Sequence, residues 1–120
     1  MWNLIFYETQ SGRCPVAEFI NALPEKLQAK ALHDLDLLQE FGNQLSMPYS
    51  KAMGNGILEL RITQSTHAAR IFYFFTQGEN IIITNGFIKK TQKTPKSELS
   101  KAVAYKRDYQ ARNLLWNLKI

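Results

Sequence analysis

The chain has 120 residues, 45% hydrophobic and 21% charged, which indicates one globular domain over residues 1–120 with a moderate core. Its net charge of +5 is uneven: residues 1–60 hold 4 basic and 7 acidic side chains, and residues 61–120 hold 11 and 3. The basic half predicts an anionic partner such as nucleic acid, or else a charged surface kept for solubility, and the single Cys14 excludes an intrachain disulfide.

The first segment, residues 2–8, predicts a short strand because it is rich in aromatic and branched residues. It lacks a basic start and a cleavage site, and no apolar run reaches the roughly 18 residues of a membrane span. We therefore expect no signal peptide, no membrane partner and a cytoplasmic location.

Two helices are expected next. Pro15 suits the first position of a short helix, whose apolar face recurs at helical spacing up to Leu23. Pro24 starts a second helix with a core face of Leu27, Ala31, Leu35 and Leu38 and an end near Gly42. The acidic residues of this helix, Asp34, Asp36 and Glu40, are expected at its solvated surface.

Residues 43–56 are expected to be irregular, and three apolar runs follow at 57–63, 69–76 and 80–88. Short polar connections between them predict an antiparallel meander. Thr94 and Pro95 then predict the start of a last helix reaching about Asn113, followed by an apolar tail at 113–120. The expected fold class is α+β, order β-α-α-β-β-β-α, with an antiparallel sheet and helices packed on one face.

The turns set which strand residues share a face, because side chains alternate along a strand. A turn at Ser65–Thr66 places Arg61 opposite Arg70, and a turn at Gly78–Glu79 places Arg70 opposite Phe87. Tyr73 falls on the other, apolar face. Opposed arginines destabilise a sheet unless an anion or Glu59 neutralises one of them. The predicted cationic face comprises Glu59, Arg61, Arg70, Asn85, Phe87 and Lys89.

The segments "GILELRI", "ARIFYFF" and "NIIITNGFIKKTQKTP", followed by a basic helix, resemble the RelE/ParE superfamily of bacterial toxins, in particular the phage-derived HigB-like branch. The resemblance implies a RelE-like, microbial-ribonuclease-type fold. It also implies a ribosome-dependent messenger RNA endonuclease of a type II toxin–antitoxin system, without a cofactor. The catalytic positions it implies are Arg61, Arg70, Lys89, Lys90 and Lys93.

Further residues are candidates for binding RNA, through charge, hydrogen bonds or stacking on bases. They are Lys51, Phe87, Gln92, Lys96, Lys101 and Arg112. Clustered cations can stabilise charge at phosphorus and can lower the pKa of a neighbouring lysine, which could then act as a base. Two isolated histidines, His33 and His67, argue against a metal site.

The resemblance also implies partners: messenger RNA on the ribosome, and a HigA-like helix-turn-helix antitoxin whose dimer holds two toxins in a heterotetramer. Two alternatives stay open at this point. One is a non-enzymatic, ParE-like inhibitor of DNA gyrase with the same fold, and the other is a nucleic-acid-binding module without chemistry. The cationic face and the "KKTQK" segment favour RNA cleavage, because a gyrase inhibitor needs no charge-stabilising cluster.

Overall fold

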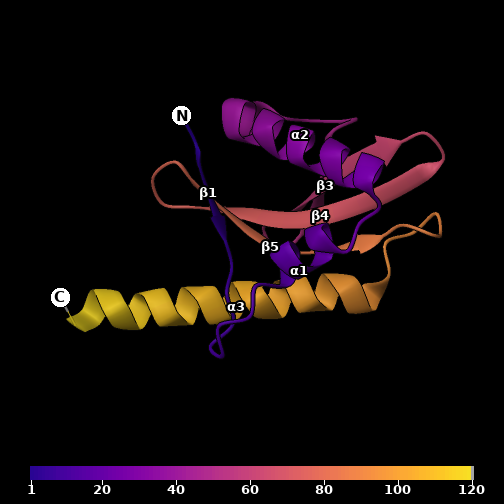
Figure 1. Ribbon diagram of the computed structural model, residues 1–120. Helices are drawn as coiled ribbons and strands as arrows, with labels where there is room; N and C mark the ends of the chain where they lie inside the picture. The colour runs from indigo at the N-terminus through magenta and orange to yellow at the C-terminus, as the bar shows by residue number, and fades with distance from the viewer. Residues whose placement is uncertain (120) are drawn as a thin grey trace.

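A computed structural model describes the backbone of residues 1–119 and the side chains of residues 1–114 (Figure 1). The helices are α1 (Pro15–Asn21), α2 (Glu25–Phe41), the short 3-10 helix η1 (Gly42–Gln44) and α3 (Lys96–Lys119). The strands are β1 (Asn3–Phe6), β2 (Ser50–Gly54), β3 (Ile57–Gln64), β4 (His67–Thr76) and β5 (Asn80–Ile88). Within these described residues, none of the helices has the length and apolarity needed to cross a bilayer.

The five strands form one mixed sheet in the order β1-β5-β4-β3-β2. Strands β2 to β5 pair antiparallel, but β1 runs parallel to β5, so the expected purely antiparallel sheet is wrong. Strand β2 lies in the region expected to be irregular, and it extends the order to β-α-α-β-β-β-β-α. The α+β class is confirmed.

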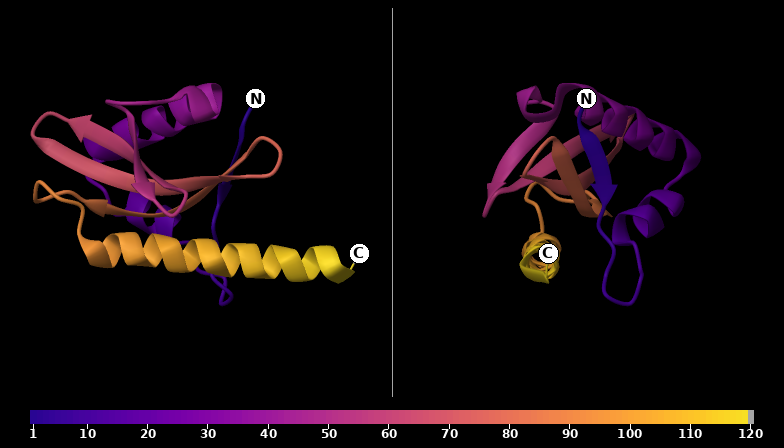
Figure 2. Two further views of the ribbon diagram at one scale, coloured as in Figure 1. Left: turned by 180° about the vertical axis from the view of Figure 1, so that it is seen from behind. Right: turned by 90° about the vertical axis from the view of Figure 1, so that its left-hand side faces the viewer.

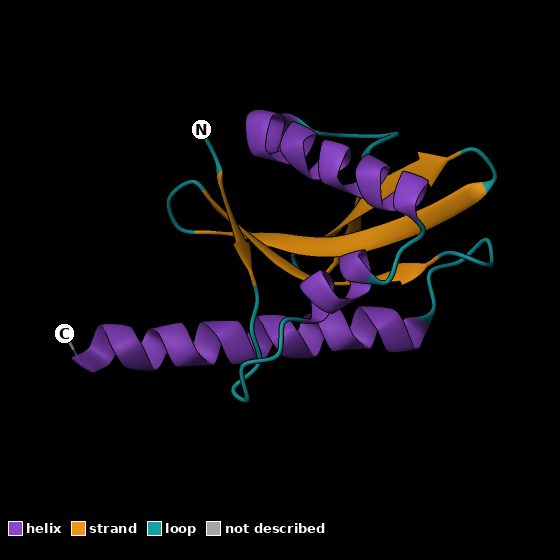
Figure 3. Ribbon diagram, in the orientation of Figure 1, coloured by secondary structure: helices purple, strands orange, loops and turns teal. Residues whose placement is uncertain are grey.

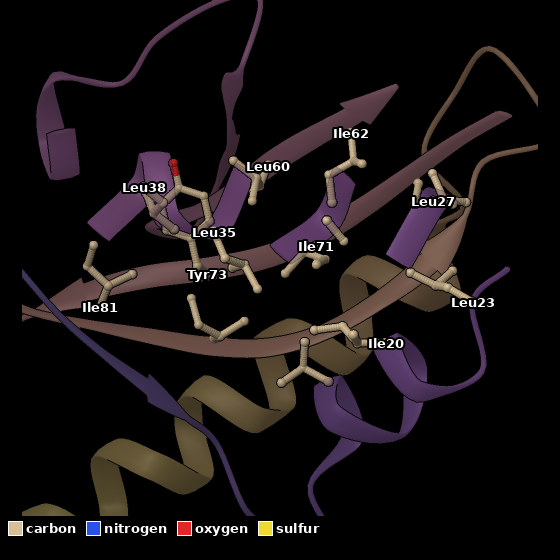
Figure 4. Close-up of a cluster of buried hydrophobic side chains, with 14 residues drawn as sticks. Ile20, Leu23, Leu27, Leu35, Leu38, Leu60, Ile62, Ile71, Tyr73 and Ile81 are labelled. Carbon is tan, nitrogen blue, oxygen red and sulfur yellow. The ribbon is translucent and has the colours of Figure 1, made fainter. Parts of the chain in front are cut away.

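The helices cover both faces of the sheet and not one, as Figures 1 and 2 show. Helices α1 and α2 pack on one face around Leu60, Ile71 and Tyr73 (Figure 4). Helix α3 packs on the other around Phe72 and Phe74. Apolar spacing predicts that a helix has a buried side, but it does not say which face of the sheet that side will cover.

Helix α2 buries the four predicted core residues, Leu27, Ala31, Leu35 and Leu38. It also buries Asp34, which is only 1% exposed and whose Oδ1 accepts a hydrogen bond from Lys30 Nζ at 2.6 Å. The expectation that Asp34 is a surface residue is therefore wrong. Its position, three residues after Ala31 and four before Leu38, puts it on the buried stripe.

Helix α3 continues to Lys119, past the predicted end near Asn113 (Figure 3). Asn113 and the exposed Leu114 are the described side chains of the predicted apolar tail, and the rest of that tail lies outside the described side chains.

A polar network docks α3 against the residues that follow β1. Tyr7 donates a hydrogen bond to Asp108 at 2.6 Å, and Gln10 donates to the same carboxylate at 2.9 Å. Arg112 also lies 2.7 Å from Asp108. The hydrogen bond from Tyr7 is the main reason that the pKa of Asp108 is lowered, while burial is the main reason that the pKa of Tyr7 is raised to about 12.

Replacing Tyr7 with Phe is expected to lower the free energy of unfolding by about 1.5–3 kcal/mol near neutral pH, because a hydrogen bond to a charged group is lost. A carboxyl group whose folded pKa is lowered contributes stability above its unfolded pKa of about 3.9, and that stability disappears as the pH falls through the folded value. The gap between wild type and Tyr7→Phe should therefore narrow below about pH 4. Urea unfolding of both proteins at pH 6 and at pH 3 measures this difference in the free energy of unfolding. Tyr49→Phe, which removes the hydroxyl of an exposed tyrosine, is the control. A gap of equal size at both pH values would contradict this role of Asp108.

Candidate functional site

Two adjacent rows of side chains run across the strands on the face of the sheet that carries α3. Arg61 of β3 lies opposite Arg70 of β4, and Arg70 lies opposite Phe87 of β5, so both predicted cross-strand pairs are confirmed. The adjacent row joins Lys51 of β2 to Glu59 of β3 and Glu59 to Phe72 of β4. Lys89 follows β5 directly, and its backbone N–H donates to Ala68 O at 2.9 Å. Arginine and lysine side chains from three consecutive strands and from the residue that follows β5 thus lie at one end of the sheet.

The hairpin of β4 and β5 pairs Arg70 with Phe87 as predicted, but its turn is not the predicted one. The connection between β4 and β5 has three residues, because Thr76 pairs with Asn80. A bulge opposite Phe72, between Ile83 and Gly86, then takes up one extra residue of β5. The two offsets cancel, so Arg70 faces Phe87 as predicted.

Glu59 provides the negative charge between these cations. It is 2% exposed, and its Oε1 lies 3.4 Å from Arg70 Nε. Its other oxygen, Oε2, accepts a hydrogen bond from Thr94 Oγ1 at 2.6 Å. Of the two possibilities raised for opposed arginines, a bound anion or Glu59, the structure shows Glu59 paired with Arg70. Thr94, which was expected to cap α3, instead binds the sheet, because its hydroxyl is committed to Glu59.

The two arginines differ in exposure. Arg70 is 5% exposed and its Nη1 donates to Ala69 O at 2.9 Å, whereas Arg61 is half-buried and its Nη1 contacts Met47 Sδ at 3.4 Å. Burial lowers the pKa of Arg70, and Arg61 adds to that effect while Glu59 opposes it. Within the described part of the chain, the Nε atoms of both arginines are buried without a hydrogen-bond partner. Arg70 Nε already faces the Glu59 carboxylate, so Arg61 Nε is the buried donor of this pair that favours an anionic ligand.

The pKa of Lys89 is affected by the charges of the whole cluster. It is half-buried, and its Nζ donates to Gln92 O at 2.9 Å. Burial is the main cause of its lowered pKa, followed by the charge of Arg70, with smaller contributions from Arg61 and Lys51 and an opposing one from Glu59. A lysine in this environment releases its proton more readily than a free lysine does.

The segment 89–95, which we call the lysine loop, connects β5 to α3 at this end of the sheet (Figure 3). Lys90, Gln92 and Lys93 are exposed, and Thr91 Oγ1 donates to Lys93 O at 2.8 Å. Lys51 on β2 is exposed as well. The five cations predicted as catalytic thus all belong to the cluster or to the loop beside it, and Lys51 adjoins them.

The four remaining predicted RNA-binding residues have other surroundings. Phe87 is only 7% exposed and packs against Phe72 at a ring distance of 5.7 Å, in the core that α3 covers, so its ring is not available for a base to stack on. Arg112 pairs with Asp108 and donates to Glu8 O, so its guanidinium docks α3. Lys101 is exposed but lies 3.4 Å from Glu98, whereas Lys96 is exposed at the start of α3.

The lowered pKa of Lys89 gives a direct test of this geometry. Replacing Arg61 or Arg70 with Gln is expected to raise the pKa of Lys89, because each removes a positive charge that lowers it. Lys51→Gln should raise it least, since Lys51 makes the smallest of these contributions. NMR titration of ¹³C-methylated lysines measures the pKa, with the Lys89 signal assigned by its loss in Lys89→Gln. A Lys89 pKa that stays constant in all three variants would show that the cluster does not converge on this side chain.

One family model matches the sequence of this chain. The family model described as "Phage derived protein Gp49-like (DUF891)" matches residues 18–107, three quarters of the chain and all of the cationic cluster. A search of curated proteins finds no match. The chain therefore belongs to the phage-derived, Gp49-like family, a toxin-like family of the RelE/HigB type.

Proposed function

We propose that the protein is the toxin of a type II toxin–antitoxin system and cleaves messenger RNA on the ribosome. The observation that carries this proposal is the pair of opposed arginines beside a lysine of lowered pKa, with the buried Nε of Arg61 free of a hydrogen bond among the described residues and that of Arg70 facing Glu59. A bent, single-stranded RNA linkage presents one phosphate to such a cluster. Membership of a toxin-like family supports the toxin role.

The reaction is an attack of the ribose 2′-oxygen on the adjacent phosphorus. The new 2′-O–P bond forms while the P–O5′ bond breaks, which leaves a 2′,3′-cyclic phosphate and a free 5′-hydroxyl. One proton must leave the 2′-hydroxyl, and one must reach the departing 5′-oxygen. Negative charge builds up on the non-bridging phosphate oxygens in between, and fixed cations stabilise it most effectively where water is excluded.

The proposed roles are matched to the exposures of the residues. Half-buried Arg61 and Lys89 are accessible to the phosphate, with Lys51, Lys90 and Lys93 exposed around them to hold the flanking backbone. Lys89, in its neutral form, accepts the 2′-hydroxyl proton, because its lowered pKa increases the fraction of that form near neutral pH. Arg70 lies beneath them and contributes charge from below.

The partners follow from the same proposal. The toxin acts on messenger RNA held in the ribosome, and the exposed Lys96 and Lys101 on α3 extend the basic surface toward ribosomal RNA. A helix-turn-helix antitoxin inhibits it, and an antitoxin dimer carries two toxins.

Arg61→Gln is expected to slow RNA cleavage by about 10²–10³-fold, the cost of removing one donor that stabilises transition-state charge. Lys26→Gln removes one positive charge from α2, on the opposite face of the sheet, and should leave the rate unchanged. Primer extension on messenger RNA from a purified translation system measures the cleavage. Intact messenger RNA with the wild-type protein would overturn the proposal, and inhibition of gyrase supercoiling in the same preparation would then support the ParE-like alternative.

A further inference from the structure

Building on the proposed function, we infer that Glu59 is a positioning residue that fastens the lysine loop to the arginine pair, so that Arg70 and Lys89 hold their places when no RNA is bound. The inference rests on the two different partners of one buried carboxylate. Oε1 faces Arg70 Nε at 3.4 Å, and Oε2 accepts the hydroxyl proton of Thr94 at 2.6 Å.

The contact with Thr94 joins parts of the chain that are distant in sequence. Glu59 and Thr94 are separated by 35 residues, and Thr94 precedes α3 by two positions. The other end of the lysine loop is fixed where Lys89 N–H donates to Ala68 O. The loop is therefore anchored to β4 at its first residue and to β3 near its last. Inside it, the bond from Lys89 Nζ to Gln92 O turns the ammonium group back toward the loop backbone.

Burial separates the role of Glu59 from that of the cations. Glu59 is 2% exposed and both of its oxygens face protein groups, so it does not contact a substrate directly. It acts through Arg70 and through the loop. Charges from three strands and the loop surround Lys89: Lys51 on β2, Glu59 and Arg61 on β3, Arg70 on β4, and Lys90 and Lys93. Glu59 is the carboxylate that offsets the cations acting on Lys89.

The first test opens the loop with a small change. Thr94→Val keeps the shape of the side chain and removes the donor to Glu59, while Thr91→Val removes a hydroxyl whose partner, Lys93 O, lies within the loop. Trypsin cuts after Lys89, Lys90 and Lys93, and mass spectrometry reports each cut. We expect Thr94→Val to be cut about tenfold faster in the loop, as loss of a hydrogen bond to a charged group implies. Thr91→Val should stay close to the wild-type rate.

The second test measures RNA cleavage by the same proteins. Thr94→Val is expected to lower kcat about 10²-fold, as for a small misplacement of catalytic groups, with KM nearly unchanged. Glu59→Gln keeps an oxygen for Thr94 but removes the negative charge that raises the pKa of Lys89, so the pKa of Lys89 should fall and the pH–rate profile should move to lower pH. A merely structural role would change the melting temperature without moving that profile.

The outcomes separate this inference from the proposed function. Equal trypsin rates in wild type and Thr94→Val overturn the fastening of the loop. Faster trypsin cleavage with unchanged kcat overturns the positioning role, because the loop then opens without consequence for the reaction. If the wild-type protein cuts no RNA, the proposed function and the catalytic part of the inference fail, while the trypsin rates still decide whether Glu59 fastens the loop.

Discussion

The opposition of Arg61 and Arg70 across two antiparallel strands is the constraint on which the rest of this site depends. Like charges directly opposite each other destabilise a sheet. Glu59, two residues before Arg61 on the same face, offsets one of the two positive charges and leaves the row cationic. The lysine loop then adds charge at the same end instead of removing it. Repulsion of this kind is tolerated where an anion arrives to relieve it, which connects the packing of the strands to the proposed chemistry.

Helix α3 divides this face of the sheet into two parts. Its apolar side covers Phe72, Phe74 and Phe87, and it begins at Lys96, directly after the lysine loop. The lysine loop bridges from β5 to that start and lies beside the cluster, in which Arg70 is buried and Arg61 is half-buried. The hydrogen bonds of Tyr7 to Asp108 and of Arg112 to Glu8 O hold α3 to the segment after β1. The docking of α3 thus determines which part of this face is buried under the helix and where the lysine loop ends.

Turn chemistry and alternation were sufficient to predict the Arg61–Arg70 pair from the sequence, because the Ser65–Thr66 turn has the expected two residues. The Arg70–Phe87 pair was predicted correctly although the second turn is one residue longer, since a bulge compensates. Strand β2 was missed because "SKAMG" has no run of branched or aromatic residues, and the parallel β1 because its pairing is set by distant strands. The burial of Phe87 and the Thr94–Glu59 bond depend on where α3 docks, which local patterns do not encode.

The burial of Arg70 changes how the resemblance to RelE-type toxins translates into chemistry. The matching motif implies a catalytic position at both Arg61 and Arg70, but Arg61 is half-buried whereas Arg70 is only 5% exposed. In the proposed reaction Arg70 therefore acts at a distance. Its charge lowers the pKa of Lys89, and its pairing with Glu59 keeps the carboxylate away from the incoming phosphate. A buried charge interacts more strongly than an exposed one, because the surrounding medium screens it less. In the proposed reaction, an arginine placed below the surface thus helps burial to lower the pKa of Lys89, the proposed proton acceptor.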